Sequence, residues 1–364
     1  MQFEKKSAIC LLIIMVVLSG CGKAQSEVTE DGYSTDEYEI TLNYSDHDPP
    51  NGMRTNFIEN YWFPEIEKET DGKVEINAIY GGGLLSSSQA LNGVRDGIAD
   101  MGLIYPDNYP NRMFSYELLK LFPEAPDDFE SIHGIIDQAM KELPRLRGVL
   151  EKNNQKPLLI TTGLPIVFAS TTELDSLSDI KGEDWRASSR WYMEVLKNMG
   201  ANPVSVPFDD VYMSLQTGMI DGVMTNYDGF HMMNFYEVAP NIIVAPSLWW
   251  SAPFIHTINQ DMWDRLPKDI QEGIMRATES AQKEFAKVYQ QELEETIQEQ
   301  KEAGANVKIA SDEDIAMFND EKLFENLRET WVKEAKEVHG IENAEQYVED
   351  MEQIVNDALE DSEE

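Results

Sequence analysis

Cysteine is almost absent from this sequence of 364 residues, in which only Cys10 and Cys21 occur. Because both lie within the first 21 residues, the rest of the chain must fold without a disulfide bond and has no thiol that could act as a nucleophile. Basic residues are also scarce, with 29 Lys and Arg against 67 Asp and Glu, and the formal net charge is −38. A chain this acidic offers no surface that neutralises phosphates, so we expect no nucleic-acid partner.

The sequence also lacks the common catalytic and cofactor motifs. None of its five histidines is paired at a spacing typical of metal ligands. The glycine run 81–83 fits neither the GxxxxGK[ST] pattern of phosphate loops nor the GxGxxG fingerprint of dinucleotide sites, and no GxSxG elbow occurs. The sequence therefore predicts a protein that is not an enzyme and that binds no cofactor or metal.

Only one long apolar run is present, the eleven-residue segment 8–18, and it follows Lys5 and Lys6. It is too short to span a bilayer as a helix, and with its basic start it has the layout of a secretory signal. Leu18-Ser19-Gly20-Cys21 resembles the lipobox of bacterial lipoproteins, in which the cysteine is diacylated and becomes the first residue. The resemblance implies a signal peptide over 1–21 and a lipid anchor at Cys21 on the outer face of the cell membrane.

The two ends of the mature chain are polar and acidic. Residues 22–37 have almost no large aliphatic side chains, which predicts a flexible tether. Residues 311–364 carry 19 acidic against 4 basic residues, yet Ala344, Tyr347 and Met351 recur there at helical spacing. We therefore interpret these carboxylates as the solvated side of amphipathic helices, and we expect 305–364 to be a helical segment that packs on the rest of the body.

Strand and helix patterns alternate from residue 39 onwards. The first set predicts strands at 39–44, 73–80 and 99–105 and helices at 57–70 and 86–97. The second set predicts strands at 158–162, 166–170, 185–187, 202–206, 222–225 and 242–245 and helices at 191–199 and 211–217. Repeated strand–helix–strand units favour an α/β fold with mainly parallel sheets, and two such sets favour two lobes joined by more than one crossing. We assign 38–163, with a return segment at about 251–260, to lobe I and 164–250 to lobe II.

The longest helical pattern falls within residues 261–304 and starts at Pro267. Apolar residues such as Ile270, Ile274 and Phe285 recur there every three or four positions. A stripe along most of this length predicts a helix that bridges both lobes. Ligands of parallel sheets lie beyond the carboxyl ends of the strands, which would place Asp46-His47-Asp48, the glycine run and Tyr105 around one cleft.

Several segments resemble the solute-binding proteins of tripartite ATP-independent periplasmic (TRAP) transporters, the DctP family. From Asp179 the chain reads DIKGEDWRASSRWYMEVLKNMGANPVSVPFDDVYMSLQTGMIDGV, followed by FYEVAP at 235–240 and DMWDRLP at 261–267. The upstream segment ETDGKVEINAIYGGGLLSSSQALNGVRDGIADMGLI at 69–104 fits the family as well. The resemblance covers most of residues 38–305, and LQTGMIDG with GANPV at the family spacing is its most specific part.

The resemblance implies a two-lobed fold like that of periplasmic binding proteins, with a long helix across both lobes. Its function would be that of an extracytoplasmic receptor that binds a small organic anion, foremost a carboxylate, and delivers it to the small and large membrane subunits of a TRAP transporter. The alternative is a receptor that presents its ligand to a membrane sensor protein, which genomic neighbours or a pull-down would distinguish.

The resemblance also indicates ligand-binding residues. Arg186 matches the arginine of the family's "KIRVP" strand, which pairs with the substrate carboxylate, and a guanidinium suits this role because its planar fork makes two parallel hydrogen bonds. Arg190 follows closely and is a further candidate. Asn226 and Tyr227 replace the common "QENP" stretch after Asp-Gly, so we expect them to contact the ligand.

The remaining candidates are mostly aromatic. Phe168 stands where many family members have a polar residue, and this predicts an apolar wall that suits a monocarboxylate with an apolar or aromatic part at least as well as a C4-dicarboxylate. Tyr105 and Trp249, with Trp191 and Trp250, are candidates for the cleft lining, with ordinary core packing as the alternative. His47 lies in the polar loop after the first strand, where a turn or capping role is the alternative.

The lipobox makes a direct prediction for Cys21→Ser. Without the cysteine no acyl chains can be attached, so the protein should appear in the medium instead of the membrane fraction, as measured by immunoblotting after cell fractionation. Cys10→Ser, which removes the other thiol of the chain, is the control and should leave the protein in the membrane fraction. Retention of Cys21→Ser in the membrane would contradict the anchor.

Overall fold

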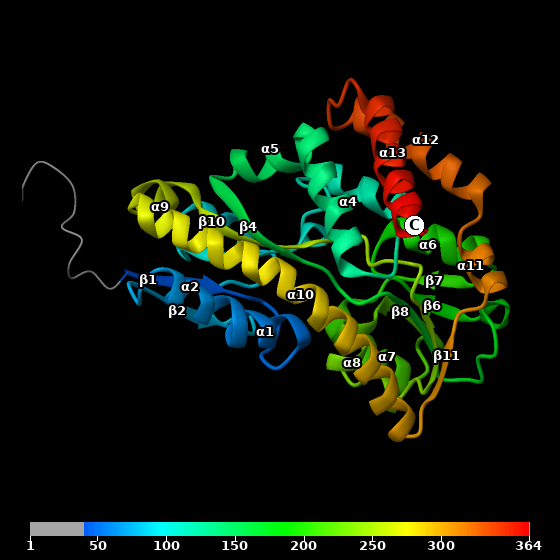
Figure 1. The fold of residues 1–364 in the computed structure, drawn as a ribbon. Helices are drawn as coiled ribbons and strands as arrows, with labels where there is room; N and C mark the ends of the chain where they lie inside the picture. The colour runs from blue at the N-terminus through cyan, green and yellow to red at the C-terminus, as the bar shows by residue number, and fades with distance from the viewer. Residues whose placement is uncertain (1–39, 364) are drawn as a thin grey trace, which may run out of the picture. The chain divides into compact units, whose positions relative to one another are not determined.

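The computed structural model describes residues 40–363. The predicted signal peptide, Cys21 and the predicted tether at 22–37 lie outside the described residues. The described chain contains two β-sheets surrounded by helices, so the predicted α/β class is confirmed (Figure 1).

The first sheet has five strands in the order β2-β1-β3-β10-β4, and we call it, with the helices packed on it, the first lobe. Its strands are β1 (Ile40–Ser45), β2 (Val74–Ile79), β3 (Met101–Ile104), β4 (Gln155–Thr161) and β10 (Phe254–Asn259). The strands β1, β2 and β3 are parallel, whereas β10 runs antiparallel to both of its neighbours. The helices of this lobe are α1 (Met53–Phe57), α2 (Phe63–Glu69), α3 (Ala90–Arg95), α4 (Phe129–Glu142), α5 (Pro144–Lys152) and α9 (Gln260–Arg265).

The second sheet has six strands in the order β11-β9-β5-β8-β6-β7, and with its helices it forms the second lobe. Its strands are β5 (Ile166–Ser170), β6 (Asp184–Arg186), β7 (Asn202–Val204), β8 (Gly222–Asn226), β9 (Asn241–Ala245) and β11 (Asn306–Ile309). Here β5 runs antiparallel to β8 and β9, while the other three pairings are parallel. The helices α6 (Arg190–Asn198), α7 (Val211–Gln216) and α8 (Tyr227–Met232) connect these strands.

In each sheet all strands but one run in the same direction, so the expectation of mainly parallel sheets is confirmed. The reversed strands are β10 in the first sheet and β5 in the second, and the reason for their direction lies in the connections between the sheets. The chain leaves the first sheet through β4, enters the second through β5, and returns through β10. Strands β5 and β10 each follow a strand of the other sheet without an intervening helix, and each is antiparallel to its neighbours. The local sequence pattern does not reveal this reversal.

Helix α10 (Lys268–Glu302) crosses from one lobe to the other. It packs on α2, α4 and β4 of the first lobe and on α8 and β11 of the second, as Figure 1 shows. At 1.5 Å per residue its 35 residues span roughly 50 Å. The side-chain amide of Gln282 bonds the backbone N–H and C=O of Ile160 at 3.2 and 2.7 Å. The helix thereby covers β4, an edge strand whose backbone would otherwise be open to pairing.

The C-terminal residues form α11 (Asp312–Phe318), α12 (Glu321–Glu337) and α13 (Ala344–Glu363). Helix α13 packs on α4, and α12 packs on α6 and on the 3₁₀ segment Phe114–Leu121. Residues 306–309 are not helical, because they add β11 in parallel to β9. Four residues that include Asn306 and Lys308 are too short and too polar for their pattern to reveal a strand.

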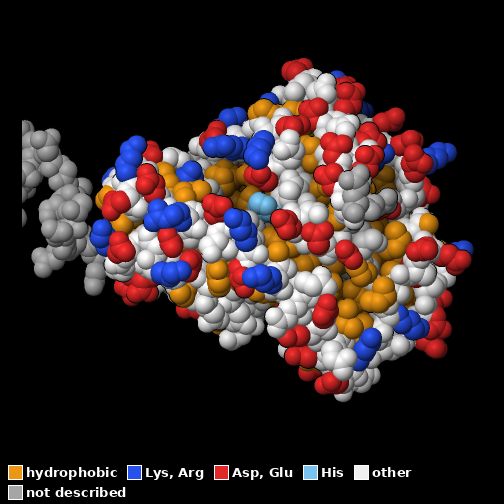
Figure 2. All heavy atoms as spheres, in the orientation of Figure 1, with side chains coloured by type: hydrophobic (Ala, Val, Ile, Leu, Met, Phe, Trp, Pro, Cys, Tyr) orange, Lys and Arg blue, Asp and Glu red, His pale blue; other side chains and the backbone are white. Residues whose placement is uncertain are grey.

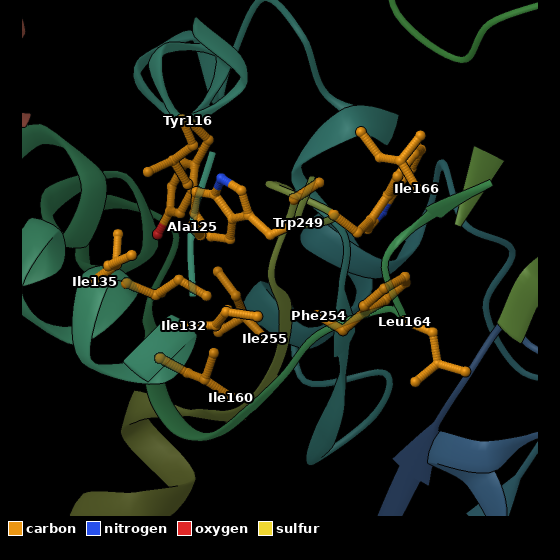
Figure 3. Packing of buried hydrophobic residues seen from close by; sticks show 14 of the residues in the cluster. Tyr116, Ala125, Ile132, Ile135, Ile160, Leu164, Ile166, Trp249, Phe254 and Ile255 are labelled. Carbon is orange, nitrogen blue, oxygen red and sulfur yellow. The ribbon is translucent and has the colours of Figure 1, made fainter. Parts of the chain in front are cut away.

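One hydrophobic core is shared by both sheets. Figure 3 shows part of it, where Ile132 and Ile135 of α4 lie beside Ile160 of β4 and Ile255 of β10. Acidic side chains are scattered over the face in Figure 2, together with lysines, arginines and hydrophobic side chains. None of the helices in residues 40–363 combines the length and the apolar character that crossing a membrane requires.

The close packing of α10 on α2 predicts the effect of Gly273→Ala. A Cβ at this helical position would lie 2.5 Å from the carbonyl oxygen of Glu69 and 2.8 Å from Cγ2 of Thr70. The two helices must move apart, so we expect the free energy of unfolding to fall by about 1–3 kcal/mol in urea titrations. Gly134→Ala in α4 is the matched control, because a Cβ there meets nothing within 4 Å, and it should stabilise the protein by up to about 1 kcal/mol. Equal effects of the two changes would contradict this packing.

Candidate functional site

A cavity of about 540 Å³ lies between the lobes, within the size range of small-molecule sites. The loops at the carboxyl ends of β1, β3, β6 and β8 border it, as expected for α/β sheets. The crossing between β9 and β10 adds Trp250 and Phe254. Its main polar and aromatic lining residues are His47, Asp48, Arg54, Tyr105, Asp107, Asn108, Arg186, Phe208, Asp209, Asn226, Trp250 and Phe254.

Arg186 ends β6 and is only 5% exposed. Its Nε donates a hydrogen bond to the carbonyl oxygen of Val206 at 3.1 Å, and its guanidinium lies 5.7 Å from the ring centroid of Phe208. Among the described residues, no carboxylate lies within 4 Å of this guanidinium, and Nη1 has no hydrogen-bond partner. Burial therefore lowers the pKa of Arg186 to about 10. A buried cation without a counter-charge in the wall of a cavity is suited to bind an anion.

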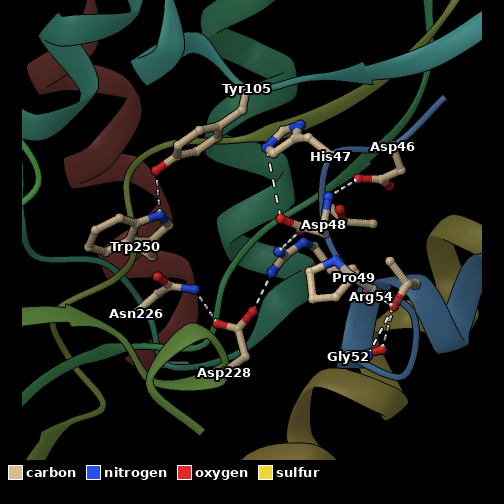
Figure 4. Close-up of polar contacts among 12 residues, drawn as sticks. Asp46, His47, Asp48, Pro49, Gly52, Arg54, Tyr105, Asn226, Asp228 and Trp250 are labelled. Atoms are coloured by element: carbon tan, nitrogen blue, oxygen red, sulfur yellow. Dashed lines mark hydrogen bonds and ion pairs between the residues drawn. The ribbon is translucent and has the colours of Figure 1, made fainter. Parts of the chain in front are cut away.

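Arg54 is also buried, but its charge is compensated within the protein. Its Nη2 pairs with Asp48 of the first lobe and its Nη1 with Asp228, the second residue of α8 in the second lobe (Figure 4). The guanidinium also lies 3.6 Å from the ring centroid of Phe254. Although burial opposes it, the charge of Arg54 holds the pKa of Asp48 below its usual value, so Asp48 is ionised at neutral pH. The two lobes are thus joined by a buried ion pair beside the cavity.

Asp228 connects this ion pair to the cavity lining and to the crossing between the lobes. Its Oδ1 accepts hydrogen bonds from the backbone N–H of Leu164 at 2.9 Å and from Nδ2 of Asn226 at 2.6 Å. A Cβ at Gly163 would lie 2.9 Å from Cβ of Asn226, so glycine is needed for the crossing to pass this close. Asn226 therefore has its amide oriented by the same carboxylate that pairs with Arg54.

A buried network under the loop after β1 holds His47 and Asp48 in place. The hydroxyl of Tyr44 donates to Asp46 Oδ2 at 2.9 Å, and Asp46 Oδ1 accepts from the backbone N–H of Asp48 at 2.8 Å. Nδ1 of His256 lies 2.7 Å from the same hydroxyl, and burial lowers the pKa of His256 to about 3, which keeps this imidazole neutral. Burial and the charge of Asp48 raise the pKa of Asp46 to about 7.

The opposite part of the wall is aromatic. Tyr105 stacks on Phe254 with ring centroids 4.6 Å apart, and its hydroxyl accepts a hydrogen bond from Nε1 of Trp250 at 3.2 Å. Asp107 follows Tyr105 and pairs with the buried Lys120 at 2.6 Å. Flat apolar surface and charged groups therefore face the same cavity.

The cavity is lined by Asp48, Gly81 and Gly82, which were expected around the cleft. It is also lined by five of the candidate ligand-binding residues, which are His47, Tyr105, Arg186, Asn226 and Trp250. The first four come from four different strand ends, so only the folded chain brings them together.

Five other predicted residues do not line the cavity. Tyr227 is buried on the far side of Asn226, where its hydroxyl donates to Oε1 of Gln300 in α10 at 2.7 Å. Phe168 lies in the middle of β5 and packs on Trp185 and Phe318. These two side chains are buried in the hydrophobic core and are not among the residues that line the cavity.

Trp249 and Arg190 are also placed elsewhere, as is Trp191. Nε1 of Trp249 donates to the carbonyl oxygen of Phe122 at 2.7 Å, within the core. Arg190 is half exposed at the start of α6 and pairs with Glu334 of α12 at 2.9 Å. Trp191 is buried and donates to Glu117 at 2.9 Å.

Sequence reasoning missed Arg54 and Asp228. Arg54 lies outside the segments that resemble the family motifs. In an acidic chain, an arginine near the start of a helix is expected to form a surface ion pair. Asp228 stands two residues after Asn226, and only this proximity could have suggested it. Their pairing joins positions 174 residues apart, so no local pattern could have shown it.

Comparison with known proteins gives a consistent result. A family model for bacterial extracellular solute-binding proteins of family 7 (DctP) matches residues 46–334. The 2,3-diketo-L-gulonate-binding periplasmic protein of Escherichia coli is 25% identical over 271 residues, which is 74% of this chain and 80% of that protein.

Solved structures show the same fold. A TRAP solute-binding protein from Rhodoferax ferrireducens, in complex with copurified benzoate, superimposes with a TM-score of 0.76 at 18% identity, and the match covers 88% of this chain and 99% of that one. A TRAP periplasmic solute-binding protein from Desulfovibrio salexigens, in an open complex, gives a TM-score of 0.71 at 23% identity over 88% and 96% of the two chains. The predicted two-lobed fold is therefore confirmed.

The pKa of Asp46 makes a prediction about stability. The folded protein keeps a proton on Asp46 up to about pH 7, whereas an unfolded aspartate releases it near pH 4. The folded state therefore binds more protons between these values, and the contribution of Asp46 to stability decreases as the pH rises through this window. Asp46→Asn removes this dependence. We expect the free energy of unfolding of the variant, relative to the natural protein, to increase from pH 5 to pH 8 in urea titrations. A difference that is independent of pH would contradict the assignment.

Proposed function

The chain belongs to the bacterial extracellular solute-binding proteins of family 7, and we propose that its solute is a small organic anion held between the lobes by Arg186. The family is one of transport receptors and not of enzymes. We further propose that the loaded receptor delivers its solute to the membrane subunits of a TRAP transporter.

The observation that carries this proposal is the unpaired charge of Arg186. Removing a guanidinium from water is costly unless another charge compensates it, and the described residues supply no carboxylate within 4 Å. A ligand carboxylate on Nη1 would supply both the charge and the missing hydrogen bond. Arg54, whose charge is already shared by two carboxylates, is not available for this role.

The rest of the lining supports a ligand with a flat or apolar part. Tyr105, Trp250 and Phe254 form a continuous aromatic wall next to the charged groups. Related structures contain benzoate, D-glucuronate and pyroglutamate, which are all monocarboxylates with a ring. We therefore favour a monocarboxylate over a C4-dicarboxylate for this chain.

The arrangement of the crossings supports a receptor that closes on its ligand. We propose that lobe I comprises residues 38–163 with the return segment at about 251–260, and that lobe II comprises residues 164–250. The helix within 261–304 bridges the two lobes, and the C-terminal segment 305–364 packs on them. The crossing at residues 246–253 contributes Trp250 to the cavity lining, and the crossing at 162–165 packs against Asn226 and Asp228 beside it. Small backbone rotations there would open or close the cleft, and a ligand that contacts both lobes would favour the closed state.

We also propose that the receptor is held at the outer face of the cell membrane by lipid on Cys21. The support is the sequence Leu18-Ser19-Gly20-Cys21 after a short apolar run. A diacyl anchor and the flexible segment 22–37 would keep the receptor close to a membrane-bound transporter while leaving its lobes free to turn.

The role of Arg186 can be tested by Arg186→Gln. Loss of the charged partner of a carboxylate in a buried site costs about 2–5 kcal/mol, so we expect the affinity for the best organic acid found by thermal-shift screening to fall about 30-fold or more in calorimetric titrations. Without ligand the variant should be at least as stable as the natural protein, because a buried unpaired charge has been removed.

Arg190→Gln is the matched control. This arginine lies four residues further along but pairs with Glu334 on the surface, so its loss should leave the affinity unchanged. If Arg186→Gln binds as tightly as the natural protein, or if no organic acid stabilises the natural protein at all, the proposed function is wrong.

A further inference from the structure

The carboxylate of Asp48 offers an unused hydrogen-bond acceptor to the cavity. Its Oδ2 pairs with Arg54, whereas Oδ1 accepts no hydrogen bond from any described residue. The imidazole Nε2 of His47 lies 3.8 Å from Oδ1, which is too far for a hydrogen bond. This imidazole is neutral at physiological pH, since burial lowers the pKa of His47.

Asp48 is held firmly in this position. Its backbone N–H is bonded to Asp46, and its other oxygen is bonded to Arg54, which in turn contacts Phe254 and Asp228. The carboxylate therefore cannot rotate away from this orientation without breaking its ion pair with Arg54. A ligand that donates a hydrogen bond would find this acceptor already oriented.

The charges around the cavity also favour a cationic group on the ligand near Asp48. Arg54 is shared by two carboxylates, and the buried Lys120 is likewise shared by Asp107 and Glu117. Each of these clusters carries a formal charge of −1, and both place an aspartate in the cavity lining. Arg186, from the second lobe, is the one guanidinium in the described lining without an acidic partner. The cavity thus has one cationic position and an acidic first-lobe wall.

We propose that the solute is an amino-carboxylate or a related monocarboxylate with a cationic nitrogen, whose carboxylate binds Arg186 and whose nitrogen donates to Oδ1 of Asp48. This inference rests on the proposed function, because it takes the carboxylate at Arg186 as given. Asp48 is then the residue that determines specificity. A second carboxylate on the ligand would be repelled by Asp48 or Asp107. A monocarboxylate without a nitrogen would make no hydrogen bond to Oδ1 of Asp48.

The experiment compares matched sets of three acids with the purified protein by calorimetric titration. The sets are butyrate, 4-aminobutyrate and succinate; hexanoate, 6-aminohexanoate and adipate; and 4-methylbenzoate, 4-(aminomethyl)benzoate and terephthalate. Within the set that fits the cavity best, the amino member should bind about tenfold or more tightly than the neutral member, and the diacid should bind most weakly.

The variant Asp48→Asn sharpens the test. The amide oxygen can still accept from Arg54, while Nδ2 takes the place of Oδ1 and presents a donor in place of an acceptor. The preference should therefore reverse, with the diacid bound more tightly than the amino member. Asp210→Asn is the matched control, since Asp210 is exposed, does not line the cavity and makes no ion pair within 4 Å with any described residue. It should leave the order unchanged.

The outcomes separate the two proposals. If neutral monocarboxylates or diacids bind as tightly as the amino members, and Arg186→Gln abolishes that binding, this inference is wrong and the proposed function stands. If no acid in any set binds, or if binding is independent of Arg186, the proposed function is wrong and this inference falls with it. Should Asp48→Asn fail to fold, the order of the three acids on the natural protein decides alone.

Discussion

The ion pair between Arg54 and the two aspartates beside it is the interaction on which the geometry of the cleft depends. One guanidinium, enclosed by Phe254, binds Asp48 of the first lobe and Asp228 of the second. Removing one partner of a buried pair costs roughly 3–5 kcal/mol, because the remaining charge has no water to solvate it. Asp228 in turn orients Asn226 and bonds the backbone of the crossing at Leu164. This single compensated charge therefore fixes Asp48, Asn226 and the crossing at Leu164 relative to one another.

The two buried arginines at the cavity show how differently one residue type can be used. Arg54 has its charge compensated within the protein by one aspartate from each lobe, so its pairing requires no solute. Arg186 has its Nε bonded to a carbonyl oxygen and its Nη1 without a partner, so compensation of its charge is left to the ligand. A ligand carboxylate gains binding energy from a charge that has no partner in the free protein. Arg186 therefore stabilises the bound state, whereas Arg54 determines the geometry of the site.

Local patterns in the sequence predicted most of the elements but not their connections. The strand at 166–170 has the predicted bounds, and the strands and helices around it differ by a few residues. Strand β11 was missed because four half-polar residues carry no clear alternation. The mainly parallel direction of the strands was predicted, but the reversal of β5 and β10 was not, since pairing between distant segments, and not periodicity, decides whether neighbours run parallel. At the cavity, Arg186 could be identified from a motif, whereas Arg54 could not, because its partner Asp228 is far away in the sequence.

The sequence by itself determined the kind of protein: its acidity, its one short apolar run ending at Cys21, its alternating elements, its long amphipathic helix and the motif around Arg186. These properties are local, and each can be read from composition or spacing over a few turns or strands. The tertiary structure alone decided which charges are compensated. Whether a guanidinium is solvated, paired or left without a partner depends on groups that folding brings within about 4 Å and on the water that it excludes. The chemistry of the cavity belongs to this second kind of information.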